Sequence, residues 1–143
     1  MWWRRSTSYA ANGPMLIVDA SCLYEVVADT ARADDVRARL AVDPDHAAPS
    51  VVDVEVVSVI RRDYRLGRLD ATAAYQAVED LRDWPGERFG HRHLLDRVWD
   101  LKGSIRAWDA FYVALAEVLD GTLITADSRL ARAPGPRCTI DVV

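Results

Sequence analysis

The feature that most restricts the fold is an alternation of short apolar runs with longer amphipathic stretches. The run Leu16-Ile17-Val18 ends at Asp19, and residues 122–125 form a second run of this kind. Short, fully apolar runs are typical of strands buried on both faces in a parallel sheet. The stretches between them carry apolar residues at helical spacing, with arginine and aspartate opposite. This pattern predicts an α/β sandwich built around a parallel sheet.

The same pattern predicts where the individual elements lie. We expect strands at residues 16–18, 47–49, 87–90, 122–125 and 137–142. We expect helices at residues 21–28, 31–42, 50–64, 92–102 and 108–119, and a further helix that begins after Asp70. Ser50 and Asp70 are residue types that commonly cap helix N-termini with their side chains, and we expect both to do so.

Composition limits the classes of function. The 143 residues are half apolar and 28% charged, which is typical of one globular domain. No uncharged apolar run approaches the ~18 residues that a membrane span requires. The formal net charge of −4 excludes nucleic-acid binding by bulk positive charge, so any such role must be local. Cys22 and Cys138 are too few for a disulfide framework, and we expect both to be buried and reduced in a cytoplasmic protein.

Residues 1–14 differ from the rest of the chain. They begin with Met1-Trp2-Trp3-Arg4-Arg5 and continue with polar and small residues, without the apolar stretch of a secretory signal. We expect this segment to be a disordered N-terminal extension. The folded domain is then expected to span residues 15–143.

Two acidic residues follow the two strands that the sequence predicts most clearly. Asp19 closes the first strand, and Asp127 comes shortly after residues 122–125. In open α/β sheets, ligands bind outside the carboxyl ends of the strands. A carboxylate at the end of a buried strand is costly unless it is paired, solvated or bound to a metal. Each residue alone has a simpler explanation, because aspartate is also a good helix N-cap.

Two further acids lie within apolar helical segments. Asp109 shares a helix face with Val113 and Ala116, although an acid in the first turn of a helix is also favoured by the helix dipole. Glu55 interrupts a run rich in valine, and its position relative to Asp53 turns the two side chains about 200° apart on a helix. We therefore expect Glu55 to face inward.

Together, these segments resemble the PIN-domain family, and specifically the ribonuclease toxins of VapBC-type toxin–antitoxin systems. The resemblance covers about nine-tenths of the chain. Its most specific blocks are Trp108-Asp109-Ala110-Phe111-Tyr112-Val113 and Leu123-Ile124-Thr125-Ala126-Asp127-Ser128, supported by Ile17-Val18-Asp19 and Val54-Glu55-Val56. It implies a Rossmann-like three-layer α/β/α sandwich, a homodimer and a cognate antitoxin as partner. It also implies that Asp19, Glu55, Asp109 and Asp127 are the metal-binding catalytic acids.

The chain departs from the family pattern beside the helical aspartate. The family often has Thr or Ser three residues before it and Tyr just before it, where this chain has Arg106 and Trp108. An arginine cannot accept a hydrogen bond, but it can contact a phosphate. The departure affects the details of the site and the choice of substrate, and it leaves the four acids in place.

The residues allow one chemical mechanism in particular. Four carboxylates in one pocket repel one another, and Mg²⁺ or Mn²⁺ relieves that repulsion. No arrangement of Ser, His and Asp or of Cys and His suggests a covalent nucleophile. We therefore expect hydrolysis of RNA by metal-activated water, with inhibition by the antitoxin. Ser21 and Thr125 flank the acids, either as donors that orient them or as residues that bond only to the backbone.

An acidic pocket that acts on RNA also needs cations. Arg62, Arg106 and Arg129 are the candidates for RNA contacts, although any of them could form an ordinary surface ion pair. One alternative function is a catalytically silent PIN-fold module that binds RNA or protein. Another is a different enzyme on the same scaffold: a DNA nuclease fits the residues, whereas a haloacid-type phosphatase would need an aspartate where Ser21 stands.

Overall fold

The computed structural model describes residues 15–143, so the expectation for residues 1–14 lies outside the described part of the chain. At its centre is a five-stranded sheet in the order β3-β2-β1-β4-β5, and every neighbouring pair of strands is parallel. The strands are β1 (Leu16–Val18), β2 (His46–Pro49), β3 (Glu87–Phe89), β4 (Thr122–Thr125) and β5 (Thr139–Val142). The predicted strands and their parallel pairing are confirmed.

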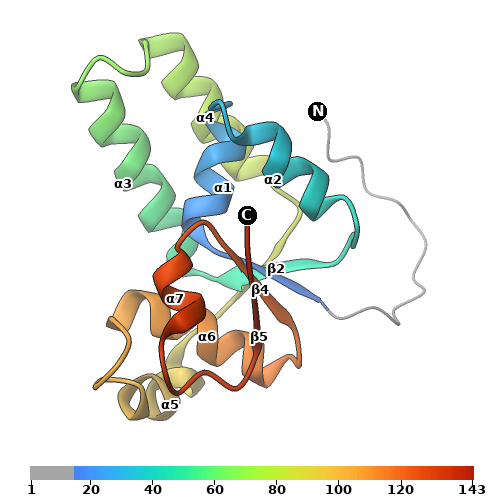
Figure 1. Cartoon of the computed structure of the whole chain (residues 1–143). Helices are drawn as coiled ribbons and strands as arrows, with labels where there is room; N and C mark the ends of the chain where they lie inside the picture. The colour runs from blue at the N-terminus through green and yellow to red at the C-terminus, as the bar shows by residue number, and fades with distance from the viewer. Residues whose placement is uncertain (1–14) are drawn as a thin grey trace.

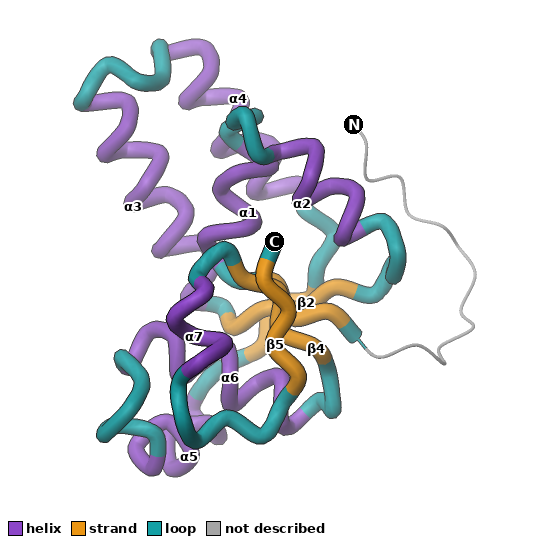
Figure 2. The backbone as a smooth tube through the Cα atoms, in the orientation of Figure 1, coloured by secondary structure: helices purple, strands orange, loops and turns teal. Residues whose placement is uncertain are grey.

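Helices cover both faces of this sheet, which gives the predicted three layers (Figure 1). The helices of one layer are α1 (Ala20–Val27), α2 (Ala33–Leu40), α3 (Val51–Arg65) and α4 (Ala71–Asp83). The other layer contains α5 (Leu95–Asp100) and α6 (Ala107–Val118), and the short 3₁₀ turn η1 (Arg92–Leu94) precedes α5. Helix α7 (Ser128–Arg132) packs beside β5 (Figure 2).

The core forms where the apolar runs of the sequence meet. The side chains of Ile17, Val18, Leu123 and Ile124 on the two central strands are completely buried. Helix α6 packs against β1, β2 and β4 and buries residues 112–116 completely. Within residues 15–143, no helix is both long enough and apolar enough to cross a membrane. The complete burial of these side chains on the central strands and of residues 112–116 on α6 explains why these elements carry the most continuous apolar sequence.

Two details of the predicted fold are wrong. Ser50 precedes α3, but its side chain does not cap the helix; its hydroxyl donates to the carbonyl oxygen of Phe89, at 3.0 Å. The hydroxyl therefore connects α3 to β3 instead. Asp70 does cap α4, accepting from the backbone N–H of Ala73 at 2.8 Å. Cys22 is buried as expected, whereas Cys138, close to the edge strand β5, is only partly buried; both are free thiols.

The strand order creates a switch point between β1 and β4. The chain leaves β1 toward β2 on one side and later returns to place β4 on the other side. The carboxyl ends of β1 and β4 therefore diverge into different connections, which opens the crevice where α/β proteins bind ligands. The backbone N–H of Asp19 donates to the carbonyl oxygen of Ile124 at 3.0 Å, so these two strand ends are held side by side.

Candidate functional site

Asp19 lies at the switch point and is almost fully buried, with 6% of its surface exposed. It precedes α1 in extended conformation, but its side chain makes no capping hydrogen bond. Its Oδ2 instead accepts from the hydroxyls of Ser21 at 3.0 Å and Thr125 at 2.7 Å. Burial raises the pKa of Asp19, against the opposing effect of the two hydroxyls. The N-cap explanation for Asp19 is therefore wrong.

Ser21 and Thr125 also connect Asp19 to the loop that carries Asp127. The backbone N–H of Ala126 donates to the Ser21 hydroxyl at 3.1 Å, and that of Asp127 donates to the Thr125 hydroxyl at 3.1 Å. Each hydroxyl thus donates to the carboxylate of Asp19 and accepts from a backbone N–H of the loop after β4. The pair fixes the spacing between the ends of β1 and β4.

Glu55 approaches the same centre from α3. Its side chain is partly buried, and its Oε1 accepts from the hydroxyl of Tyr112 on α6 at 2.8 Å. The pKa of Glu55 is raised to about 7, mainly by burial and to a smaller extent by the charges of Asp19 and Asp109. The expectation that Glu55 faces inward is confirmed. Tyr112 had no assigned role in the sequence analysis, although its place one turn after Asp109 on an apolar helix was a usable signal.

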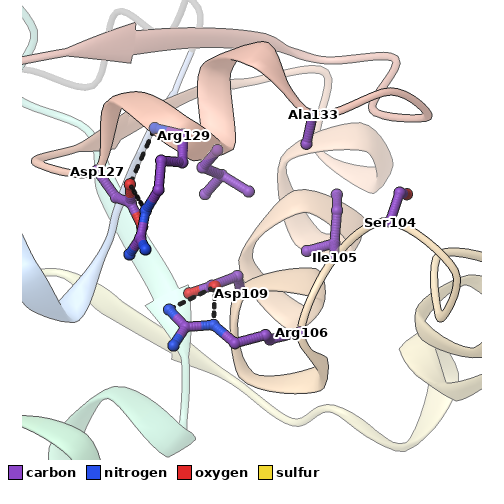
Figure 3. Close-up of a pocket in the computed structure, with 8 residues that line it drawn as sticks. Ser104, Ile105, Arg106, Asp109, Asp127, Arg129 and Ala133 are labelled. Atoms are coloured by element: carbon purple, nitrogen blue, oxygen red, sulfur yellow. Dashed lines mark hydrogen bonds and ion pairs between the residues drawn. The ribbon is translucent and has the colours of Figure 1, made fainter.

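Asp109 and Asp127 lie opposite each other across a pocket between the start of α6 and α7 (Figure 3). Each is paired with a neighbouring arginine. Arg106 contacts Asp109 at 3.2 Å, and Arg129 binds both carboxylate oxygens of Asp127 at 3.1 Å. Hydrogen bonds from Arg129 lower the pKa of Asp127. The N-cap explanation for Asp127 is confirmed, because its side chain also accepts from the backbone N–H of Arg129 at the start of α7.

Three of the acids, Asp19, Glu55 and Asp109, are close enough for their charges to influence one another, and Asp127 lies across the pocket from Asp109. The charge of Asp109 raises the pKa of Asp19, and both raise the pKa of Glu55. The charge of Arg106 has a lowering effect on the pKa of both Glu55 and Asp127, although its ion pair is with Asp109. The structure brings together the acids that the sequence predicted, on four different elements.

Arg106 and Arg129 lie at the pocket, as expected of cations close to the acids. Arg62 does not line it: it lies two helical turns beyond Glu55 on α3 and pairs with Asp63 at 3.0 Å. Its predicted contact with RNA would therefore be farther from the acids than those of the other two arginines.

The acids also fit a divalent cation in their chemistry. Carboxylate oxygens are the hard donors that Mg²⁺ and Mn²⁺ prefer, and a cation would oppose both causes that raise the pKa of Glu55, its burial first and the charges of Asp19 and Asp109 second. In the described part of the chain, no three His, Cys, Asp or Glu side chains already converge as a metal site. The oxygens of Asp109 and Asp127 are directed to Arg106 and Arg129 instead. A bound cation would take over oxygens that these guanidinium groups now hold.

The fold and the site define a class: a three-layer α/β protein with a cluster of carboxylates at the switch point of its parallel sheet. The model of the PIN domain matches residues 16–136. The chain therefore belongs to the PIN domain family, as the sequence motifs indicated.

Curated relatives within this family share much of the sequence. The chain is 42% identical over 119 residues to Ribonuclease VapC3 of Mycobacterium tuberculosis, covering 82% of this chain and 86% of the relative. It is 35% identical over 129 residues to Ribonuclease VapC9 of the same species, covering 90% of this chain and 98% of the relative.

Two solved structures share the fold. PAE2754 from Pyrobaculum aerophilum superimposes with a TM-score of 0.64 at 23% identity, covering 97% of this chain and 93% of that one. VapBC2 from Rickettsia felis, bound to a DNA fragment from its promoter, superimposes with a TM-score of 0.62 at 14% identity. That match covers 90% of this chain and 98% of the other. At these identities, the two structures support the architecture alone.

Proposed function

We propose that this protein is the toxin of a type II toxin–antitoxin system and acts as an endoribonuclease that depends on Mg²⁺ or Mn²⁺. The observation that carries the proposal is the group of mutually repelling carboxylates, Asp19, Glu55 and Asp109, at the switch point of the sheet. Asp19 and Glu55 accept hydrogen bonds from hydroxyls and from no cation among the described residues, and acids of this kind are costly to bury for structure alone. The ribonuclease names of the curated relatives support RNA as the substrate.

Each acid has a distinct role in the proposed reaction. Asp19, Asp109 and Asp127 would hold the divalent cation, which polarises the phosphodiester and stabilises the leaving oxygen. Glu55, counted among the metal acids by the family resemblance, also has a pKa close to neutral, which suits a group that orients water and accepts its proton. The Tyr112 hydroxyl fixes the direction of the Glu55 carboxylate.

The neighbouring polar side chains support these acids. Ser21 and Thr125 hold the carboxylate of Asp19 in one orientation through its Oδ2. Arg106 and Arg129 contact the phosphates around the scissile bond, and Arg62 contacts the RNA at a greater distance along α3. Both arginines at the pocket are well exposed, with 73% and 77% of their side-chain surface accessible, so they can reach a strand once a cation takes over the oxygens of Asp109 and Asp127.

The partners and the location follow from the same proposal. A cognate antitoxin inhibits the enzyme, by analogy with the relatives named VapC and the neighbour named VapBC2. We further propose that residues 15–143 form the PIN domain, that the protein forms a homodimer, and that it works in the cytoplasm, where its RNA substrate is. These proposals do not depend on the chemistry of the acids, and each can be tested separately from it.

The test is cleavage of total cellular RNA by the purified protein without antitoxin, in Mg²⁺ or Mn²⁺ and in EDTA. We expect fragments that require the metal and that disappear in Asp109→Asn. Asp96→Asn, on the exposed surface of α5, is the matched control and should cleave as the wild type does. Cleavage that survives in Asp109→Asn, or that needs no metal, would overturn the mechanism; cleavage of DNA but not RNA would favour the DNA nuclease.

A further inference from the structure

The pocket between the start of α6 and α7 has two chemically different ends. Its cavity volume is about 180 Å³. The acids and their arginines line one end, and an apolar surface with one serine lines the other (Figure 3). The lining residues are Ser104, Ile105, Arg106, Asp109, Asp127, Arg129, Leu130 and Ala133. The proposed catalytic acids account for the charged end and leave the apolar end without a function.

The apolar end is built from side chains that the core otherwise holds in place. Ile105 and Leu130 are 7% and 5% exposed, and Ala133 is partly buried against the core. The surface they present is therefore rigid and faces the pocket. The Ser104 hydroxyl makes one long hydrogen bond, of 3.5 Å, to the carbonyl oxygen of Leu101. It can therefore still pair with the polar edge of a ligand.

The size of the cavity limits what can enter it. An apolar cavity of about 150 Å³ accommodates one benzene ring. The pocket here, at about 180 Å³, has a similar volume, so one six-membered ring fills the space between its walls. A flat ring with polar edges would match the apolar wall, the serine hydroxyl and the planar guanidinium groups at the rim.

We propose that this pocket binds a single pyrimidine base of the RNA, attached to a nucleotide beside the scissile phosphate. This inference rests on the proposed function, because it takes RNA as the substrate. Asp109 and Asp127 belong both to the acid cluster and to the pocket wall, so a phosphate held at the acids places an adjacent base at the pocket. Ile105 and Leu130 contact the face of the base, and Ser104 bonds to its edge.

The geometry also explains why the base must be unstacked. A base stacked inside a duplex is not available to a pocket of the protein, whereas a flexible single strand can turn one base outward. Arg106 and Arg129 stand at the entrance, where a guanidinium plane can stack on a base or bind the flanking phosphates. The enzyme should therefore cut single-stranded RNA at positions defined by one pyrimidine.

The test observes the pocket directly and does not depend on catalysis. Protein labelled on its isoleucine, leucine and alanine methyl groups is titrated, in EDTA, with uridine 5′-monophosphate, adenosine 5′-monophosphate or ribose 5-phosphate and followed by NMR. We expect the signals of Ile105, Leu130 and Ala133 to shift with the uridine nucleotide. The adenosine nucleotide should bind about tenfold more weakly because its larger base does not fit. Ribose 5-phosphate should leave these methyl signals unchanged.

Two variants complete the test. Ala133→Leu fills the pocket from a backbone conformation that any residue can adopt, and it should weaken uridine nucleotide binding about tenfold. Ala131→Leu adds the same side chain two residues earlier, at an exposed position of α7 outside the pocket, and should bind as the wild type does. Equal methyl shifts with ribose 5-phosphate, or unchanged binding by Ala133→Leu, would overturn the proposal.

Cleavage by the wild type separates this proposal from the function on which it rests. If the protein cuts RNA with metal but its fragment ends show no pyrimidine preference, the base pocket is wrong and the ribonuclease stands. If the protein cuts no RNA while the methyl signals respond to uridine nucleotide as expected, the pocket binds a base and the ribonuclease is wrong.

Discussion

Two buried aspartates of almost equal exposure, Asp19 and Asp63, have opposite chemical surroundings. Their exposed fractions are 6% and 7%, and each accepts a hydrogen bond from at least one hydroxyl. Asp63, on α3, accepts from Tyr24 and from two arginines, and the Tyr24 hydrogen bond is the main reason its pKa is lowered. Asp19 accepts from the hydroxyls of Ser21 and Thr125 and from no cation among the described residues, and burial raises its pKa.

The difference separates a carboxylate kept for structure from one kept for chemistry. Asp63 connects α1 to the end of α3, and its carbonyl oxygen also accepts from the loop before α4. Both of its carboxylate oxygens accept hydrogen bonds within the protein, Oδ2 from Tyr24 and Oδ1 from the two arginines. Asp19 is held in position without a cationic partner among the described residues, so its ionised form is unfavourable at the switch point unless a cation binds there. Two glutamates repeat the contrast: Glu117 is paired with Arg97 and Arg137, whereas Glu55 is not paired with any cation among the described residues.

The largest predicted effect is on Asp19. Asp19→Asn should reduce metal-dependent RNA cleavage by more than the 10–100-fold typical of losing a residue that only orients a metal ligand. The amide oxygen can still accept from the two hydroxyls, so the free energy of unfolding at pH 8 should be equal or higher than in the wild type. Cleavage rates and urea unfolding curves, measured in parallel, check both statements. A variant that cleaves normally would place Asp19 with the structural acids.

Asp63→Asn should show the opposite pattern. Its loss weakens the bond from Tyr24 and should lower the free energy of unfolding by about 2 kcal/mol. Arg62 and Arg68 are 58% and 63% exposed, so their ion pairs contribute little to this loss. Cleavage per folded molecule should remain unchanged. Asp96→Asn is the control for stability; a comparable loss in that variant, or a specific loss of cleavage in Asp63→Asn, would contradict the assignment.

Thr125→Val tests whether the hydroxyls beside Asp19 orient it. Valine keeps the shape of threonine but removes the donor to Asp19 and the acceptor for the Asp127 N–H. We expect binding of Mn²⁺ to weaken about tenfold, measured by calorimetry without RNA. Thr30→Val removes a hydroxyl near the end of α1 that bonds to Glu25, and it serves as the control. Unchanged Mn²⁺ affinity in Thr125→Val would limit that hydroxyl to a structural role.

The sequence predicted the sheet because buried strands leave local signals, whereas the set of four acids came from the resemblance to the PIN-domain family, since each acid alone had a simpler explanation. Strands buried on both faces must be apolar throughout, and an acid directly after such a strand is conspicuous. What the sequence could not predict depends on contacts between distant elements. The bond from Tyr112 to Glu55 joins α6 to α3, and the bond from Ser50 to Phe89 replaces a helix cap by a contact to β3. The apolar end of the pocket also needs α6 and α7 to be brought together.

The smallest predicted effect is a pH dependence that distinguishes Glu55 from the paired acids. Its pKa is about 7 in the folded protein and 4.5 when unperturbed, so between these values the folded state binds more protons than the unfolded chain. The free energy of unfolding should therefore fall as the pH rises from 5 to 8 in EDTA, by about 1 kcal/mol from this group once solvent screening is allowed for.

Glu55→Gln should remove that part of the slope, because glutamine does not titrate. Asp19, whose pKa is also raised, should leave a residual slope of the same sign. Adding Mn²⁺ should oppose the slope in the wild type, since the cation favours the ionised carboxylates that burial disfavours. Urea unfolding at pH 5, 6, 7 and 8 measures the slope for the wild type, for Glu55→Gln and for the wild type with Mn²⁺. Identical slopes for the wild type and Glu55→Gln would mean that Glu55 is already ionised at pH 5 and behaves as Asp63 and Glu117 do.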